Sequence, residues 1–205
     1  MIHGMVTRFL SQPRIFQWQQ RLCNNYAAVK EHFARHLQAS DKDILEIGCS
    51  TGNCGSTLVS MERNRYVGID IVPGYIELAR QRHPAGTFMA MNARCLVFPH
   101  SSFDLILFIA ALHHMEDQVV RDCLAEVRRV IRRDGVVLCA EPVFTKGKAL
   151  STLLLTLDRG KHIRTEQGYR ALFDGFVITD TNYFDFSIHR FCSFILQPAR
   201  LAQAA

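Results

Sequence analysis

The spacing of the apolar residues changes along this chain and predicts alternating strands and helices. Short apolar runs predict strands at residues 43–47, 66–69, 87–91, 103–110 and 136–140, and the unbroken run at 103–110 indicates a strand that is buried on both faces. Between them, apolar residues recur at three- and four-residue steps, which is typical of amphipathic helices. The predicted helices cover residues 15–37, 52–62, 73–84 and 118–132, the last one stopped by Asp134-Gly135. Helical connections between these strands indicate parallel pairing through right-handed crossovers.

The pattern differs after residue 142. Residues 149–157 and 165–173 predict two helices, and residues 176–185 and 188–196 predict two strands with only Phe186 and Ser187 between them. A connection this short joins two strands only as an antiparallel hairpin. We therefore expect a doubly wound, Rossmann-like α/β sheet of seven strands, mostly parallel, with one antiparallel strand in the C-terminal hairpin.

The turn after the first predicted strand carries the first candidate chemistry. The strand ends at Glu46-Ile47 and continues into Gly48-Cys49-Ser50-Thr51-Gly52. Glycine adopts positive φ and lets a ligand approach the backbone closely. The glycine spacing excludes the G-x-G-x-x-G dinucleotide fingerprint, and the Gly-Lys-Ser/Thr of a P-loop does not follow. Asp70 ends the second strand about 20 residues beyond the turn, where an acid can accept hydrogen bonds from ribose hydroxyls.

Four motifs, taken in order, resemble those of the class I S-adenosylmethionine-dependent methyltransferases. They are Ile44–Gly52, Tyr66–Asp70, Ser102–Ile106 continuing to Leu112-His113-His114, and Val127–Gly135. The similarity covers residues 40–142, and the hairpin extends it to about residue 197. The resemblance implies a single methyltransferase domain over residues 1–205. Its parts are an N-terminal helical lid (1–39), a cofactor-binding core (40–142), acceptor-side helices with the closing hairpin (143–197) and a tail (198–205).

The resemblance also implies S-adenosylmethionine as the cofactor. Residues that it places at this cofactor are Glu46, Gly48, Ser50, Gly52, Asp70, Ile71, Asn92, Ala93 and Ile109. Glu46 would hold the ammonium group, Asp70 the ribose hydroxyls and Ile71 the adenine. Three positions depart from the family: Ser50 replaces a common glycine, Asn92 a common acid, and Asp134-Gly135 a Pro-Gly-Gly turn. The Asn92 side-chain oxygen still accepts a hydrogen bond.

Candidate residues for the methyl acceptor follow the fourth and fifth strands. His113 and His114 are predicted as catalytic residues, because an imidazole can orient an acceptor or take its proton. The alternative is that both are structural. Glu141, Arg159 and Arg164 are predicted to bind the substrate, since guanidinium groups clamp anions. The alternative for the arginines is that ion pairs with neighbouring acids, Asp158 or Glu166, fix the loop.

Composition limits the partners. The chain carries 24 Lys+Arg against 19 Asp+Glu, which is too modest an excess for a dedicated nucleic-acid binder. Arg128, Arg129, Arg132 and Arg133 are expected to form a solvated helix face. Seven cysteines without a Cys-x-x-Cys pair argue against a metal site and for a reducing, cytoplasmic location. We expect no secretory signal or membrane span, since the longest apolar run is too short.

The sequence thus predicts transfer of a methyl group from S-adenosylmethionine to an oxygen, nitrogen or carbon of a small molecule, by a monomer or homodimer without a metal. Such transfer needs positioning more than acid–base chemistry. One alternative is a non-methylating cofactor-binding protein or a cyclase on the same fold. Another is an RNA methyltransferase. The charge argues against it, as does Ala111-Leu112-His113-His114, which does not resemble the Asn-Pro-Pro-aromatic acceptor motif.

Overall fold

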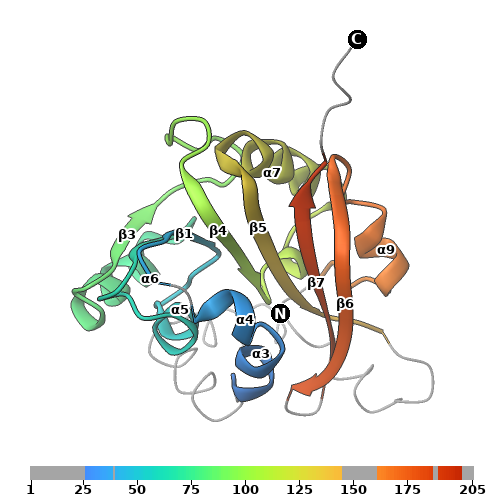
Figure 1. Ribbon diagram of the computed structural model, residues 1–205, viewed down its shortest axis with the longest axis horizontal. Helices are drawn as coiled ribbons and strands as arrows, with labels where there is room; N and C mark the ends of the chain where they lie inside the picture. Colours follow the sequence, from blue (N-terminus) through green and yellow to red (C-terminus); the bar gives the residue numbers. More distant parts are fainter. Residues whose placement is uncertain (1–25, 39, 145–160, 187–188, 200–205) are drawn as a thin grey trace, which may run out of the picture.

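A seven-stranded sheet forms the centre of the computed structural model, which describes residues 26–38, 40–144, 161–186 and 189–199 (Figure 1). Its strands are β1 (Asp43–Ile47), β2 (Arg65–Asp70), β3 (Thr87–Ala90), β4 (Phe103–Ile109), β5 (Ile131–Pro142), β6 (Phe176–Phe186) and β7 (His189–Pro198). They are arranged in the order β3-β2-β1-β4-β5-β7-β6. The first five pair in parallel, and β7 is antiparallel to both β5 and β6. The predicted fold class is confirmed.

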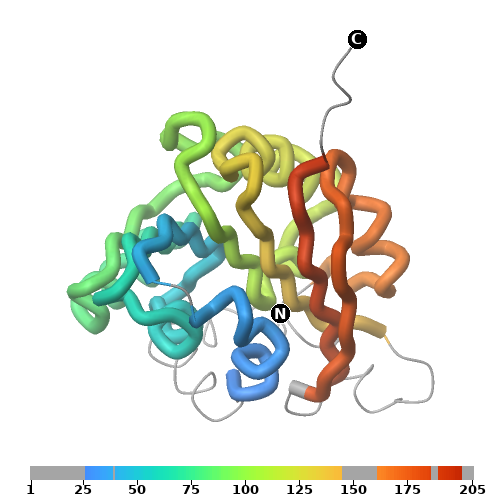
Figure 2. Tube along the Cα trace, viewed as in Figure 1, coloured from blue at the N-terminus to red at the C-terminus, as the bar shows by residue number. Residues whose placement is uncertain are grey.

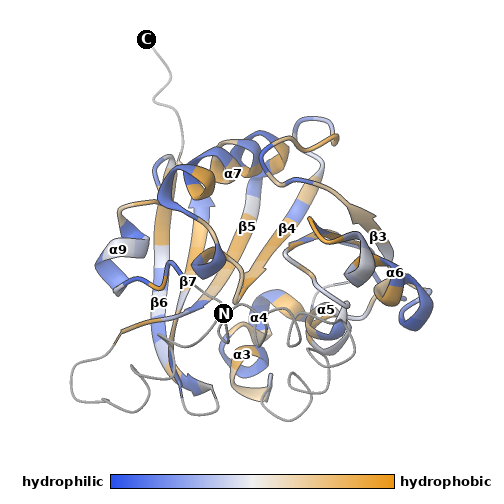
Figure 3. Ribbon diagram, turned by 180° about the vertical axis from the view of Figure 1, so that it is seen from behind, coloured by the Kyte–Doolittle hydropathy of each residue, from blue (hydrophilic) through white to orange (hydrophobic). Residues whose placement is uncertain are grey.

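Helices cover both faces of this sheet. One face carries α3 (Ala27–His32), α4 (Ala34–Leu37), α5 (Asn53–Leu58) and α6 (Pro73–Arg82), and the other carries α7 (Asp117–Val130) and α9 (Glu166–Arg170). Alternate residues of β4 serve the two layers: Leu105 and Leu107 pack toward α3–α6, and Ile106 and Phe108 toward α7 and α9. Burial on both sides explains the apolar run, visible as orange along most of β4 in Figure 3.

The N-terminal helical region differs from the prediction. The chain forms two short helices rather than one, because Phe33 leaves the helical conformation between α3 and α4 while its ring is fully buried. The trace places α3 beside β6, far away in sequence, with side-chain nitrogens of His32 and Asn182 3.1 Å apart (Figure 2). Predicted helical segments before residue 26, including Trp18, and at 149–157 lie outside the described residues. No helix in the described ranges is long and apolar enough to cross a membrane.

The connection from β3 to β4, residues 91–102, contains no helix, contrary to the expected crossover pattern. Side chains of α7 hold this segment instead. Arg129 donates to the carbonyl oxygens of Leu96 and Phe98, each at 2.7 Å, and Glu126 accepts the Leu96 N–H at 2.8 Å. These partners satisfy backbone groups that a helix would otherwise satisfy internally. Arg129, predicted to be solvated, is therefore a structural residue.

The start of β5 also corrects the prediction. Helix α7 ends at Val130 and the strand begins at the next residue, so Asp134-Gly135 does not cap the helix. Gly135 lies inside β5, where a Cβ would be 3.1 Å from the Asp104 carbonyl oxygen. Glycine is required there by close backbone approach at a register shift between β4 and β5. Arg132, predicted on the helix, belongs to β5 and forms an ion pair with Asp104 at 2.6 Å.

Candidate active site

The carboxyl ends of β1, β2, β4 and β5 meet at one edge of the sheet. Strand β1 lies between β2 and β4, so the chain leaves β1 toward one side and returns on the other. Open α/β sheets bind their ligands outside such a switch point. Three segments meet there: the turn after β1, Asp70 at the end of β2, and the segment that follows β4.

The turn after β1 has a backbone conformation that glycine favours. Gly48 and Gly52 have φ of +77° and +79°, and Ser50 between them has φ of +50°. A Cβ on Gly48 would lie 2.9 Å from the Cβ of Ala111, which follows β4. The turn and the segment after β4 are therefore in direct contact, and only glycine at position 48 permits that approach.

Asp70 fixes this turn from the end of β2. One carboxylate oxygen accepts the Ser50 N–H at 3.0 Å, and the other accepts the Val72 N–H at 2.9 Å. Burial raises the pKa of Asp70, and these backbone donors oppose that rise. A carboxylate offers about four acceptor positions, so these backbone donors leave room for a ligand hydroxyl. The neighbouring Ile71 side chain is apolar and 70% exposed, which suits contact with a flat ring.

Two hydroxyl groups in the turn lack partners within the described part of the chain. The side-chain oxygens of Ser50 and Thr51 are buried and have no hydrogen bond among the described residues. A buried hydroxyl left unpaired costs about 1–3 kcal/mol, so a polar ligand group at the turn would relieve that cost. Left-handed glycines, unpaired hydroxyls, and an acid beside an exposed apolar side chain together fit the methionine and nucleoside parts of S-adenosylmethionine.

Glu46 lies beneath the turn and is only 1% exposed. Its carboxyl group accepts a hydrogen bond from the Tyr66 hydroxyl. Burial raises the pKa of Glu46 to about 7, against the lowering effect of hydrogen bonds from Tyr66 and Cys54. A Cβ on Gly55 of α5 would meet both Glu46 and the Tyr66 hydroxyl, so the carboxyl group is directed toward α5. Its predicted contact with the cofactor ammonium group stays a prediction.

Three further predicted cofactor residues lie along the same edge. Asn92 is exposed after β3, and its side-chain oxygen accepts the Arg94 N–H at 3.0 Å, which leaves a second lone pair. Ala93 is 8% exposed, and Ile109 at the end of β4 is 7% exposed. Their contacts with adenine and with the methionine group stay predictions.

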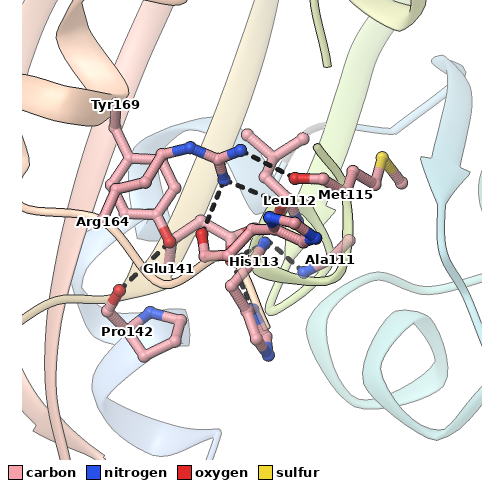
Figure 4. A network of polar contacts seen from close by, with 9 residues as sticks. Ala111, Leu112, His113, Met115, Glu141, Pro142, Arg164 and Tyr169 are labelled. Atoms are coloured by element: carbon pink, nitrogen blue, oxygen red, sulfur yellow. Dashed lines mark hydrogen bonds and ion pairs between the residues drawn. The ribbon is translucent and has the colours of Figure 1, made fainter. Parts of the chain in front are cut away.

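Glu141, at the end of β5, has a role that the sequence did not reveal. Its carboxylate is fully buried and has four polar contacts, three of them with backbone N–H donors (Figure 4). One oxygen accepts the backbone N–H groups of Ala111 and Leu112 at 2.9 and 2.8 Å. The other accepts the His113 backbone N–H at 3.3 Å and lies 2.8 Å from His113 Nδ1. Instead of facing a substrate, the carboxylate holds the segment after β4.

Arg164 holds the same segment from the opposite side. Its guanidinium group donates to the carbonyl oxygens of Leu112 at 3.1 Å and Met115 at 2.7 Å, and it pairs with Asp117 at 2.6 Å (Figure 4). Only 9% of its side chain is exposed. These contacts occupy the donors that the sequence assigned to an anionic acceptor. They correspond to the structural alternative, with Asp117 in place of the expected Glu166 as partner.

The remaining acceptor-side residues lie in different settings. His113 is 4% exposed and His114 is exposed, with ring centroids 4.0 Å apart. Glu166 pairs with Arg170 at 2.6 Å. Arg159 lies outside the described residues.

The fold and this edge match what the four motifs imply, a class I S-adenosylmethionine-dependent methyltransferase domain. A family model described as "Methyltransferase domain" matches residues 44–135 of this chain. The matched range contains the turn, Asp70 and the segment after β4, and the resemblance inferred from the four motifs is confirmed.

Curated relatives match the same region. A phthiotriol/phenolphthiotriol dimycocerosates methyltransferase of Mycobacterium ulcerans is 34% identical over 108 residues, 51% of this chain and 39% of the relative. The O-methyltransferase cnsE of Penicillium expansum is 32% identical over 120 residues, 56% of this chain and 43% of the relative. This chain spans about two fifths of the length of these relatives.

Among solved structures, magnesium protoporphyrin IX methyltransferase of Synechocystis, with bound SAH, has the same fold. The TM-score is 0.71 at 13% identity, and the match covers 96% of this chain and 99% of that one.

Proposed function

We propose that this protein transfers a methyl group from S-adenosylmethionine to a small-molecule acceptor. The observation that carries the proposal is the turn after β1, whose unpaired hydroxyls and positive φ angles lie beside Asp70 at the switch point. The bound cofactor would supply a methyl group activated by its sulfonium. The two curated relatives support a small acceptor, since their names describe a lipid methyltransferase and an O-methyltransferase.

Each cofactor residue has a proposed task. Asp70 accepts hydrogen bonds from the ribose hydroxyls, and Ile71 and Asn92 contact the adenine. The hydroxyls of Ser50 and Thr51 bind the polar end of the methionine group, which the glycines at 48 and 52 let come close. Glu46 supports the turn from below, in reach of the ammonium group.

The segment Ala111–Met115 forms the acceptor side, with His113 and His114 as the proposed catalytic residues. Methyl transfer requires the donor carbon and the acceptor atom in line and at contact distance. Glu141 and Arg164 hold the backbone of this segment through buried hydrogen bonds, which fixes where an acceptor can lie. In this arrangement the chain positions the reactants and limits water at the reacting atoms.

The location and assembly complete the proposal. We place the protein in the cytoplasm, as a monomer or homodimer. All six cysteines of the described ranges are free thiols, in keeping with a reducing compartment.

Calorimetry with S-adenosylhomocysteine and S-adenosylmethionine tests the cofactor site. We expect binding of both, and a loss of at least about tenfold in Asp70→Ala, since hydrogen bonds to a charged group contribute about 1.5–3 kcal/mol. Asp174→Ala is the matched control, because its side chain is 89% exposed beyond α9. Absence of binding in the wild type, or unchanged affinity in Asp70→Ala, would contradict the proposed site.

Transfer of a labelled methyl group into cell extract tests the substrate class. After fractionation into small molecules, lipids and RNA, label is expected in the small-molecule or lipid fraction. Label in RNA alone would overturn the small-molecule acceptor.

A further inference from the structure

The contact between Glu141 and His113 specifies which ring nitrogen of His113 carries a proton. The carboxylate accepts three backbone N–H groups besides the ring, so it acts as an acceptor throughout. An ionised carboxylate has no hydrogen to donate. The 2.8 Å contact therefore requires a proton on Nδ1, and the neutral ring then has its lone pair on Nε2.

Among the residues that the structure describes, His113 Nδ1 contacts Glu141, and no hydrogen bond to Nε2 is found. The ring cannot turn freely, because Glu141 binds both Nδ1 and the backbone N–H of the same residue. Its backbone carbonyl accepts the His162 N–H at 3.0 Å. The imidazole is thus fixed in one tautomer and one orientation.

The position of His113 relates it to the cofactor turn. Ala111, two residues earlier, would contact any Cβ added to Gly48 at 2.9 Å. Ala110, which follows β4, has φ of +54°, a left-handed conformation that is costly for a residue with a side chain. Such strain persists only where surrounding contacts impose it, and here the Glu141 carboxylate and the Ala110 N–H bond to the Ala140 carbonyl at 2.8 Å do so.

We propose that His113 Nε2 takes the proton of a phenolic or enolic hydroxyl on the acceptor, and that Glu141 is the residue that positions it. This inference rests on the proposed function and names its substrate class. A phenol is a weak nucleophile until its proton is removed, whereas an amine already presents a lone pair. A neutral imidazole held in a single tautomer is suited to the phenol and is not needed for the amine.

The step balances in atoms and electrons. The acceptor O–H bond breaks, and its proton bonds to the lone pair of His113 Nε2. An oxygen electron pair forms the new O–C bond as the S–C bond breaks, and that electron pair stays on sulfur. The resulting imidazolium is paired with Glu141 until its proton passes to solvent.

Nitrogen NMR on histidine-labelled protein tests the tautomer without turnover. At mildly alkaline pH, we expect His113 to show a protonated Nδ1 and an unprotonated Nε2. In Glu141→Gln, the amide oxygen can accept the Ala111 and Leu112 N–H groups, which places the amide N–H₂ toward Nδ1. The proton should then move to Nε2. A wild-type protein with the proton on Nε2 would overturn the inference.

His113→Asn separates the catalytic role from a structural one and does not depend on the Glu141 variant folding. The asparagine amide places an N–H near the position of Nδ1 and keeps the bond to Glu141, but it has no equivalent of Nε2. We expect turnover to fall about 10²–10⁴-fold, the usual contribution of a general base. Affinity for S-adenosylhomocysteine and the urea midpoint should stay at wild-type values. His100→Asn, an exposed histidine before β4, is the matched control.

The acceptor for these assays is identified from the labelled product isolated from cell extract, and NMR locates the methylated atom in that product. A methyl group on a phenolic or enolic oxygen, together with loss of turnover in His113→Asn, supports the inference. A methyl group on nitrogen, sulfur, carbon or an aliphatic alcohol overturns it, as does full turnover in His113→Asn. Wild-type protein that does not bind S-adenosylhomocysteine refutes the proposed function itself, which is a distinct result.

Discussion

Replacing Gly55 by alanine tests how tightly the cofactor turn is supported from below. Gly55 is buried in α5, and its φ is not in the left-handed region. An added Cβ would press against the Tyr66 hydroxyl and the Glu46 carboxyl group, which are hydrogen-bonded to each other. The space that a methyl group needs is therefore occupied by a buried polar pair.

The expected magnitude combines three effects. Alanine is favoured over glycine within a helix by roughly 0.5–1 kcal/mol. Overpacking costs about 1–3 kcal/mol, and separating the buried Glu46–Tyr66 pair costs about 1–3 kcal/mol more. Gly55→Ala should therefore lower the free energy of unfolding by about 1–5 kcal/mol, although helix propensity alone predicts a gain.

Urea unfolding followed by circular dichroism measures this difference. Gly74→Ala in α6 is the matched control, because Gly74 is exposed and its φ is not left-handed. That variant should gain up to about 1 kcal/mol. In a double-mutant cycle, Tyr66→Phe removes the nearest atom, so Gly55→Ala should cost at least about 1 kcal/mol less in that background. If Gly55→Ala is as stable as Gly74→Ala, the packing argument is wrong.

Three further results are expected. Burial raises the pKa of Glu46 to about 7 from an ordinary 4.5, so its protonated form stabilises the fold, and this contribution is lost as pH rises through about 7. Between about pH 5 and pH 8 the wild type should lose about 1–3 kcal/mol more than Glu46→Gln in urea titrations, and parallel profiles would contradict this. Thr51→Val should raise the free energy of unfolding by about 0.5–1 kcal/mol, because the variant lacks a buried hydroxyl that has no partner among the described residues. The same variant should bind S-adenosylhomocysteine about 3–10-fold more weakly by calorimetry. Unchanged affinity would exclude the hydroxyl from the cofactor site. Arg164→Lys removes the guanidinium group that donates to the Leu112 and Met115 carbonyls, and it should lower the free energy of unfolding by about 1–3 kcal/mol, seen as a lower Tm. An unchanged Tm would show that Arg164 does not hold this segment.

The strands were predictable because buried strands consist of short runs of apolar residues, which can be recognised in the sequence. The apolar run 103–110 packs against the helices on both faces of the sheet. The two hairpin strands are joined by too few residues for a crossover connection, so they pair antiparallel. The segment 91–102 and Gly135 were not predictable in the same way. Their conformations depend on Arg129 and on the Asp104 carbonyl, which other parts of the chain bring to them.

In the candidate site, too, some features were predictable from the sequence and others only from the tertiary structure. The turn from Gly48 to Gly52 and the acid at position 70 follow from the sequence alone, because glycine spacing and the acid that ends the next strand are local signals. Only the tertiary structure shows that the Glu141 carboxylate contacts the His113 ring. The same is true of Arg164, which donates to the nearby Leu112 carbonyl. Both depend on β5 pairing with β4 in the register that places Ala140 against Ile109. The pattern along a strand records which faces are buried, but the neighbour that meets a buried carboxylate is fixed only when the strands pair.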